Sequence, residues 1–395
     1  MRTHSSIGAR VRALTLCAAS LMTACGGDVT GPNPTPTPGA TGKYVYAGST
    51  GSSSIGAYLI NATTGALTAI GQATLSDSSR VLSLALDPAG RFLYVARIGD
   101  RGGIEAFAIN RATGALSPVP GSPFDLDHQA DALLIDPNGR YVRAVRTFNF
   151  LIDTFSLDGT SGSLTPRPVS TRLDLDFAPA APVFHPDGKR MYFSAATFSR
   201  VEQAAVDASS GTLSAGSFTE VPDTVRSLTV DPTGALLYVT TATPFSSDTL
   251  FAYRISATGG LTRWPGSVFA SGFDPAANNL RPDIVTFDPT GRFAYVLDRA
   301  ARTGARSRGV FAFPVQSGLL GPTVLGPYSS PPTPPLLLGD PVAFALDPSG
   351  RFAFLLDQSA STVSSFVVDS ATGSWTPSGM AVTTPRNSSF LVVTQ

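Results

Sequence analysis

The 395-residue chain is poor in cysteine and in charge, and each shortage excludes a class of chemistry. Its two cysteines, Cys17 and Cys25, lie near the N-terminus, so residues 26–395 have no thiol for catalysis, for disulfides or for metal binding. Only 14% of the residues are charged, and 28 basic residues balance 28 acidic ones. This balance does not favour nucleic acid as a partner.

Motifs for metal, nucleotide and calcium sites are also missing. The sequence has no His-Glu-x-x-His, no nucleophile elbow in a suitable context, no phosphate-binding glycine loop and no calcium loop. We therefore expect no cofactor. Outside the N-terminus no long 3.6-residue hydrophobic period occurs, so we expect no helical domain.

The chain is rich instead in glycine and proline, with 38 and 32 residues, and its glycines mark a repeat. Seven times a small residue is followed by Gly, one further residue and a large apolar residue. The glycines are 49, 48, 49, 48, 59 and 55 residues apart; they are Gly65, Gly114, Gly162, Gly211, Gly259, Gly318 and Gly373. A period of about 40–50 residues built from short strands is typical of propeller blades.

A second repeat, Asp-Pro-x-Gly, alternates with the first. Asp accepts backbone hydrogen bonds, Pro presets φ, and Gly takes the position with φ > 0, so each copy predicts a hairpin turn. The six copies begin at Asp87, Asp136, His185 (in place of Asp), Asp231, Asp288 and Asp347. Each unit then reads strand a, Asp-Pro-x-Gly turn, strand b, loop, strand c, Gly turn, strand d.

Seven c–d turns but six a–b turns leave one strand a unaccounted for. The first repeat starts within strand b, at residues 43–47, and residues 389–394 have the character of a strand a. The sequence therefore predicts an all-β fold over residues 43–395. This is a seven-bladed β-propeller of four-stranded antiparallel blades, closed by the C-terminal strand in the N-terminal blade.

The N-terminus predicts export. Three arginines precede a short apolar stretch, residues 13–21, which is too brief to span a bilayer stably. The sequence Leu21-Met22-Thr23-Ala24-Cys25 resembles a bacterial lipoprotein signal, which implies cleavage after residue 24 and lipidation of Cys25. An ordinary secretory signal with a chance cysteine is the alternative. Residues 25–42 would be a Pro/Gly-rich tether, and Gly26 rather than Asp after the cysteine favours the outer membrane of the cell envelope.

Residues 94–97 (Tyr-Val-Ala-Arg), 104–109 (Ile-Glu-Ala-Phe-Ala-Ile) and 112–117 (Ala-Thr-Gly-Ala-Leu-Ser) resemble the blade motifs of the lactonase family of seven-bladed propellers, the 6-phosphogluconolactonase type. The resemblance covers residues 43–395. It implies the propeller fold and, as an activity, lactone hydrolysis. Turn and strand residues carry these motifs, so they say little about the site itself.

The loops between blades and between strands b and c share the face opposite the turns, where propeller sites usually lie. Five residues before each turn aspartate an inner strand begins, and three of these positions are charged; the set is Leu82, Asp131, Ala180, Arg226, Asp283 and Val342. The charged three predict a polar or anionic small-molecule site. Mutual salt bridges around a water-filled channel are the alternative.

The family resemblance implies a His before one inner strand, an Arg-His pair before another, and Glu or Arg after a strand b. Here Asp131 stands at the first position with His128 upstream, Ala180-Ala181 replaces Arg-His, and residues 193–196 contain no Glu. Arg299 matches the family arginine. For catalysis Asp131 or His128 would be the base, with Arg226 or Arg299 as its electrostatic partner.

Two functions follow. The first is an exported, lipid-anchored, monomeric ring that binds a small anionic or sugar-derived ligand, or a partner, through Asp131, Arg226, Asp283 and Arg299 without the full catalytic set. The alternative is a hydrolase of sugar lactones. The loop at 299–308, with four arginines, and the loop at 321–340 are expected on the same face. The first could attract an anionic ligand or a partner, and the second could cover the channel or contact a partner; both could also be merely solvated segments. His185 is expected to be a turn residue on the other face.

Overall fold

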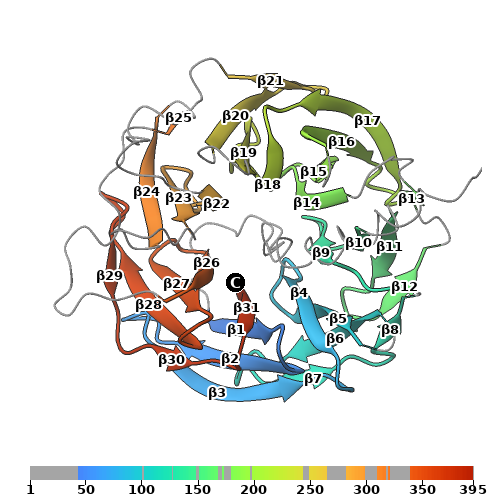
Figure 1. Ribbon diagram of the computed structural model, residues 1–395. Coiled ribbons are helices and arrows are strands. Elements are labelled where there is room, and N and C mark those ends of the chain that lie inside the picture. The colour runs from blue at the N-terminus through green and yellow to red at the C-terminus, as the bar shows by residue number, and fades with distance from the viewer. Residues whose placement is uncertain are drawn as a thin grey trace, which may run out of the picture.

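The computed structural model describes residues 43–99, 102–126, 128–147, 151–167, 171–172, 179–195, 198–242, 249–264, 282–298, 309–316, 319–320 and 339–394. These residues form strands and turns and contain no helix, and so none that could cross a membrane. Seven antiparallel sheets stand around a central axis (Figure 1). The predicted all-β, seven-bladed propeller is confirmed.

Each blade has four strands in order from the axis outward. Blade 1 comprises β31 (Ser388–Val393), β1 (Tyr44–Ser49), β2 (Ser54–Ile60) and β3 (Leu67–Thr74); blade 2 comprises β4 (Arg80–Leu86), β5 (Phe92–Ile98), β6 (Gly103–Ile109) and β7 (Leu116–Pro118). Blade 3 comprises β9 (Ala132–Ile135), β10 (Tyr141–Arg146), β11 (Leu151–Leu157) and β12 (Leu164–Pro166); blade 4 comprises β14 (Pro179–Phe184), β15 (Arg190–Ala195), β16 (Arg200–Val206) and β17 (Leu213–Glu220).

Blade 5 comprises β18 (Thr224–Val230), β19 (Leu236–Ala242), β20 (Thr249–Ile255) and β21 (Leu261–Arg263). Blade 6 comprises β22 (Pro282–Phe287), β23 (Phe293–Asp298), β24 (Gly309–Gln316) and β25 (Leu319–Leu320); blade 7 comprises β26 (Pro341–Leu346), β27 (Phe352–Asp357), β28 (Thr362–Val368) and β29 (Trp375–Pro377). Three short strands, β8 (Phe124–Asp125), β13 (Thr171–Arg172) and β30 (Val382–Thr383), add to the third strand of blades 2, 3 and 7.

The two ends of the ring meet in blade 1. Strand β31 pairs antiparallel with β1, with Tyr46 opposite Val392, so the C-terminal strand completes the N-terminal blade. The N–H of Thr394 donates to the carbonyl of Tyr44 at 2.9 Å, and the N–H of Tyr44 donates to Thr394 Oγ1 at 3.0 Å. The ring therefore closes through its own strands, which confirms the predicted closure and leaves no open end between the first and last blades.

Each Asp-Pro-x-Gly sequence forms the hairpin turn between the first two strands of a blade. In the first copy Asp87 Oδ1 accepts the N–H groups of Arg91 and Phe92, and Gly90 has φ +61°. The aspartates are almost completely buried because the turn folds over them. In blade 4 His185 takes the place of Asp, and its Nε2 lies 2.9 Å from the carbonyl oxygen of Gly234 in the next blade.

Contacts between neighbouring blades form the core of the protein. One buried cluster contains Phe92 and Tyr94 of blade 2 with Val142 and Phe155 of blade 3, and similar clusters lie between other adjacent blades. Burial of such side chains stabilises the ring by about 1.5–3 kcal/mol each relative to exposure. A blade therefore depends on both neighbours for stability.

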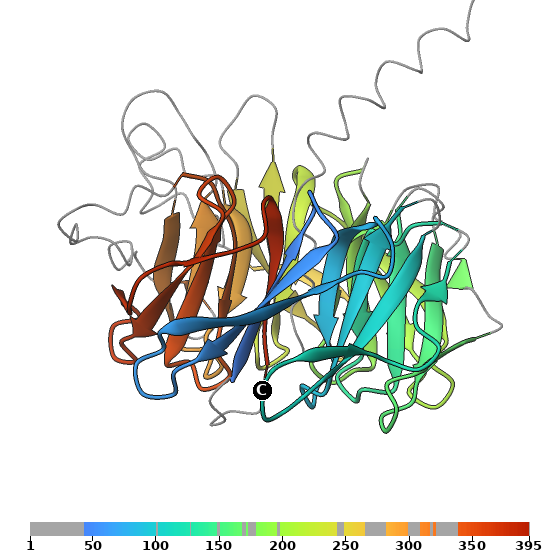
Figure 2. The same ribbon diagram turned by 90° about the horizontal axis from the view of Figure 1, so that it is seen from below.

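The ring has two different faces, seen edge-on in Figure 2. One carries the Asp-Pro-x-Gly turns, the Gly turns and the C-terminal end of β31, and we call it the turn face. At the opposite face the second strand of each blade ends, and its first and third strands begin. We call it the loop face.

Candidate functional site

Most of the inner strands have a β-bulge near the loop face. In four of them one residue is skipped in the pairing with the second strand: Leu82, Arg226, Asp283 and Val342. In blade 1 Ser389 is skipped in the same way. A bulge redirects a side chain that a regular strand would point into the sheet, and bulges are over-represented beside functional sites. Two of the charged positions predicted from the sequence thus coincide with a bulge.

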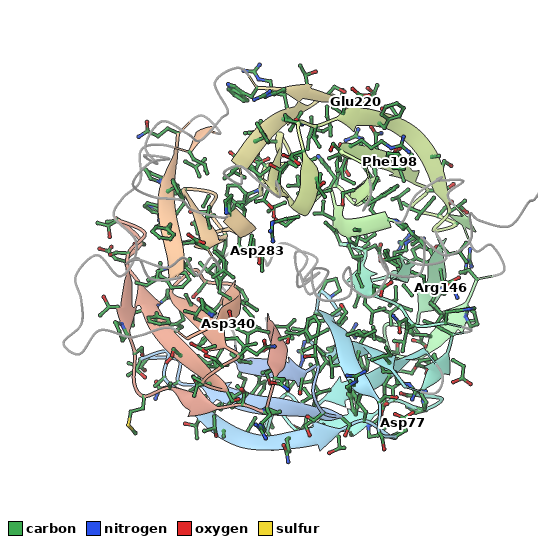
Figure 3. All side chains as sticks on the ribbon, viewed as in Figure 1. Asp77, Arg146, Phe198, Glu220, Asp283 and Asp340 are labelled. Atoms are coloured by element: carbon green, nitrogen blue, oxygen red, sulfur yellow. The ribbon has the colours of Figure 1, made fainter. Side chains whose placement is uncertain are left out.

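Two of the predicted ligand-binding residues lie together. Arg226 of blade 5 and Asp283 of blade 6 form an ion pair, with 3.5 Å between Nη1 and Oδ1. The Asp283 side chain is 8% exposed and the Arg226 side chain 36% exposed. Figure 3 shows Asp283 at the inner rim of its blade, facing the centre of the ring. Because the guanidinium remains partly open to solvent, it can also reach an anionic group in the channel mouth.

Neighbouring hydroxyls position the backbone around this pair. Thr240 Oγ1 donates to the carbonyl of Asp283 at 3.1 Å, and the N–H of Ser227 donates to Thr240 Oγ1 at 2.9 Å. Blade 5 therefore holds the bulge of blade 6 directly. The ion pair spans a blade interface that is already fixed by hydrogen bonds.

Asp131 lies at the equivalent position in blade 3 and makes contacts within its own blade. The N–H of Asp131 donates to the carbonyl of Val145, the residue that pairs with Ala132 in the sheet. Asp131 Oδ2 accepts the N–H of Thr147 at 2.7 Å. Gln129 Nε2 lies 3.4 Å from Oδ1. The carboxylate is half-buried and caps the chain after β10. It keeps acceptor capacity for a ligand on Oδ1.

Of the other predicted site residues, the structure describes His128 but not Arg299 or Cys25. His128 is exposed, three residues before Asp131, and its backbone leaves no room for a Cβ on Gly102. Arg299 and Cys25 lie outside the described residues, as do residues 301–308 and 321–338. Within the described part of the chain no group of three or more His, Cys, Asp or Glu side chains is placed to hold a metal ion.

Blade 4 has small residues where the family resemblance implies an Arg-His pair. Ala180 pairs with Ser194, and the irregularity falls on Ala181 and Pro182 rather than on Ala180. Pro182 has no N–H to donate to a neighbouring strand, which suits a bulge, and Ala181 has φ +44°, an uncommon conformation for a residue other than glycine. The count of five residues therefore misses the bulge in this blade. Ser194 Oγ donates to the carbonyl of Ala180 at 3.1 Å, and the described residues 179–183 at the start of this inner strand offer no charge to a ligand.

Sequence reasoning missed a set of buried carboxylates on the third strands of blades 2, 3 and 4. Glu105, Asp153 and Glu202 occupy the same register position, opposite Val95, Ala144 and Phe193. Asp153 pairs with Arg146 at 2.6 Å, and Glu202 pairs with Arg200 at 2.7 Å. In the sequence, the acidic residue that recurs near the start of the third strand in blades 2, 3 and 4 is the signal that could have identified these buried carboxylates.

Glu105 holds the loop that enters blade 2. Its Oε1 accepts the N–H of Ser76 at 2.9 Å and its Oε2 accepts the Ser76 hydroxyl at 3.1 Å. Burial raises the pKa of Glu105, although these hydrogen bonds and Arg97 act in the other direction. In the same place Arg97 pairs with Asp77, whose pKa is lowered by hydrogen bonds from Ser79 and by Arg97. These groups fix loops at the rim of the face and lie away from the channel mouth.

Comparison with known proteins agrees with this architecture. A family model described as Lactonase, 7-bladed beta-propeller, matches residues 39–129. No curated protein sequence matches the chain.

Among solved structures, a candidate 6-phosphogluconolactonase from Bacteroides uniformis superposes with a TM-score of 0.71 at 16% identity, covering 90% of this chain and 100% of that one. The periplasmic gluconolactonase PpgL of Pseudomonas aeruginosa gives a TM-score of 0.67 at 19% identity, covering 89% of this chain and 99% of that one. At these identities the structures establish the fold. In fold the chain is a seven-bladed β-propeller, and over residues 39–129 its sequence matches the model of the lactonase family.

Proposed function

We propose that this protein is an exported, lipid-anchored lactonase-like propeller that binds a small polar or anionic ligand at the channel mouth of its loop face. The observation that carries the proposal is the Arg226–Asp283 pair at the bulges of two adjacent inner strands. Because the Arg226 side chain is partly exposed, a carboxylate or phosphate can approach its guanidinium from solvent, and a sugar hydroxyl can donate to Asp283 or Asp131.

The residues of the site favour binding over efficient catalysis. Lactone hydrolysis needs a base that activates water and donors that stabilise the oxyanion. Ala180 and Ala181 stand where the family resemblance implies Arg and His, and Asp131 is already engaged by the N–H of Thr147. Asp131, His128 and Arg299 would have to form a rebuilt catalytic set.

Lactone hydrolysis is the second candidate, and one comparison favours it. PpgL is a periplasmic gluconolactonase, so a structural neighbour with that activity works outside the cytoplasm. The predicted export of this chain is compatible with the same location. Anchoring through Cys25, at the outer membrane, completes the proposal for localisation; residues 25–42 would tether a monomeric ring.

A ligand screen tests the binding proposal. Purified protein is titrated calorimetrically with sugar lactones and with the corresponding sugar acids, and Arg226→Gln and Asp283→Asn are compared with the native chain. We expect Arg226→Gln to lose at least tenfold in affinity for the sugar acids, the cost of about 1.4 kcal/mol in lost charge-assisted hydrogen bonds, whereas Asp283→Asn keeps the guanidinium and should still bind them. Arg351→Gln, an exposed arginine on the turn face, is the matched control and should bind normally.

Turnover measurements separate the two functions. The same lactone panel is incubated with the native chain, with Asp131→Ala and with Arg299→Ala. Binding without turnover supports the ligand-binding function. Turnover that either substitution abolishes supports the hydrolase and excludes a purely binding role.

A further inference from the structure

Basic side chains recur at one position of the turn face. The residue after the turn glycine is Arg or Lys in five of the six Asp-Pro-x-Gly turns, and Lys43 stands at the same place before β1, as Arg91 does before β5. Only Ala235 interrupts the series. Six of the seven blades thus carry a cation at the same level; these residues are Lys43, Arg91, Arg140, Lys189, Arg292 and Arg351.

The aspartates that open five of these turns lie beneath this ring of cations. The five turn aspartates are at most 7% exposed and accept N–H groups of their own turns. All six cations are exposed or half-exposed, and Arg111 and Arg190 lie beside them. Against these eight cations the described turns expose four carboxylates: Asp158, Asp187, Asp207 and Asp369. The outermost layer of the face is therefore positive, although the buried aspartates make its field short-ranged.

A cavity of about 460 Å³ opens on this face where the two ends of the ring meet. Lys43, Tyr44 and Thr394 line one side, and Gly90 and Arg111 line the other. Lys43 Nζ donates to the carbonyl of Arg111 at 2.5 Å, and Tyr44 Oη donates to the same oxygen at 3.1 Å. The Arg111 side chain is held separately, because its Nη2 donates to the carbonyl of Ala89 at 2.8 Å. Both cationic side chains thus lie at one groove, which suits a phosphate group with several acceptor oxygens.

The N-terminal tether joins the ring at this groove. Lys43, which lines the cavity, directly follows residues 25–42. A lipid at Cys25 would keep the groove within the reach of a short Pro-rich chain, about 3.1 Å per residue when extended. Such tethering raises the effective concentration of the face at the membrane, so even weak, short-ranged contacts become occupied.

We infer that the turn face lies against the anionic headgroups of the membrane, with a headgroup phosphate seated between Lys43 and Arg111. The inference rests on the proposed lipid anchor. It directs the loop face, with Arg226 and Asp283, away from the membrane, because the two faces are on opposite sides of the ring (Figure 2). The channel mouth then stays open to soluble ligands.

Vesicle flotation tests the contact without the lipid. The lipid-free chain, residues 26–395, is suitable because the ring closes through β1 and β31 and makes its described contacts without the tether. It is floated with phosphatidylcholine vesicles with and without about 30% phosphatidylglycerol. We expect binding only to the anionic vesicles, lost when salt shortens the range of the charges. Lys43→Glu/Arg111→Glu should weaken binding about tenfold or more.

The matched control reverses two exposed arginines on the loop face, Arg80→Glu/Arg386→Glu, which gives the same change in net charge. It should float like the native chain, and thermal unfolding should show that both double variants are folded. Equal loss of flotation in the two variants would overturn the inference, as would equal binding to neutral vesicles.

The lipidated protein reports the orientation directly. Ala112→Cys on the turn face and Ala360→Cys on the loop face place single thiols at exposed alanines. In proteoliposomes a polar maleimide should label the second at least several times faster than the first. Equal labelling of a membrane-anchored protein overturns the inference and leaves the anchor standing. If the lipidated protein fails to partition into membranes, the proposed anchor is overturned. Flotation of the lipid-free chain then still decides whether the turn face binds anionic headgroups.

Discussion

The hydroxyl of Tyr94 in blade 2 donates to the carbonyl oxygen of Gly162 in blade 3 at 2.8 Å, and the bond is buried. Tyr46 makes the same bond to Gly114, and Tyr192 to Gly259, each from a second strand to the Gly turn of the next blade. The two sequence repeats therefore meet in space. Tyr94 stands seven residues after the turn residue Asp87, as Tyr192 does after His185, and each secures the glycine turn of the following blade.

The first prediction concerns this bond. Tyr94→Phe leaves the buried carbonyl of Gly162 without its donor, and such a loss costs about 1–3 kcal/mol. The free energy of unfolding, measured in urea, should fall by that amount. Tyr44→Phe is the matched control, because its hydroxyl bonds the carbonyl of Arg111 at a less buried site and at 3.1 Å. A loss in Tyr44→Phe as large as in Tyr94→Phe would contradict a special role for the buried bond.

Gly162, which accepts the Tyr94 hydroxyl, should resist substitution for two reasons: its positive φ and the close approach of a neighbouring ring. Gly162 has φ +78°, and a Cβ there would lie 2.4 Å from the Phe92 ring. Gly121 has φ +85°, and its nearest neighbour would be an ordinary 3.6 Å away. We expect Gly121→Ala to cost about 1 kcal/mol for the backbone and Gly162→Ala at least about 2 kcal/mol more for the collision. Similar losses in thermal unfolding would refute the steric part.

Blade 3 departs from the tyrosine pattern, and the departure predicts a stabilising change. Arg143 takes the tyrosine position, is fully buried and donates to the carbonyl of Gly211 and to Thr154 Oγ1. Its Nε and Nη2 have no hydrogen-bond partner among the described residues, and burial lowers its pKa to about 10.

Arg143→Tyr removes a buried charge and keeps a donor for Gly211, so unfolding free energy should rise by about 1 kcal/mol. Arg143→Met removes the charge but leaves that carbonyl unsatisfied, and its gain should be smaller. Calorimetric melting of the three proteins decides the order. Destabilisation by both substitutions would mean that the guanidinium has a role that tyrosine cannot supply.

The fold was predictable from the sequence because both repeats are local. Asp87 and Gly90, or Thr64 and Gly65, specify turns within a few residues, and their order along the chain gives blade number and closure. The charged bulge residues Arg226 and Asp283 were predicted from the same count. In blade 4 the count failed because the irregularity lies one to two residues later, at Ala181 and Pro182.

The buried ion pairs were not predictable in that way. Glu105 depends on Ser76 in a loop 29 residues earlier, and Arg97 depends on Asp77. The same residue types occur in many solvated loops. Only the cross-strand register and the approach of the neighbouring blade distinguish a buried acid from an exposed one. The pairing of Arg226 with Asp283 likewise needs the position of two blades, so the sequence could nominate these residues but could not identify their partners.

Glu105 predicts a dependence of stability on pH. Its folded pKa is raised above the ordinary value of about 4.5, so the folded state binds the proton more tightly than the unfolded state. The contribution of this group to stability is therefore largest at low pH and falls as pH rises through the window above 4.5. Glu105→Gln lacks this titration and should gain stability relative to the native chain between pH 4 and pH 7, roughly the range in which carboxyls titrate.

Asp357 supplies a comparison of opposite sign. Burial pushes its pKa up, but the N–H groups of Ala360, Asp340 and Gly339 and the Ser359 hydroxyl outweigh burial and leave the pKa lowered. Its contribution is present above the ordinary value and is lost as pH falls, so Asp357→Asn should lose stability relative to the native chain as pH rises. Parallel curves for the two variants in urea unfolding would refute the assignment of either shift.

The last prediction separates a ligand site from a purely structural ion pair. Asp283 is almost buried, whereas Arg226 is about one-third exposed, so the two partners should not be equivalent. Arg226→Gln leaves a buried carboxylate without this cation and should cost about 1–3 kcal/mol. Asp283→Asn leaves a guanidinium that water can solvate and should cost less than about 1 kcal/mol. A bound anion adds a second signature: it should raise the melting temperature of the native chain and of Asp283→Asn, but not that of Arg226→Gln. If ligand stabilises all three proteins equally, recognition lies elsewhere on the loop face, and the pair serves only to join blades 5 and 6.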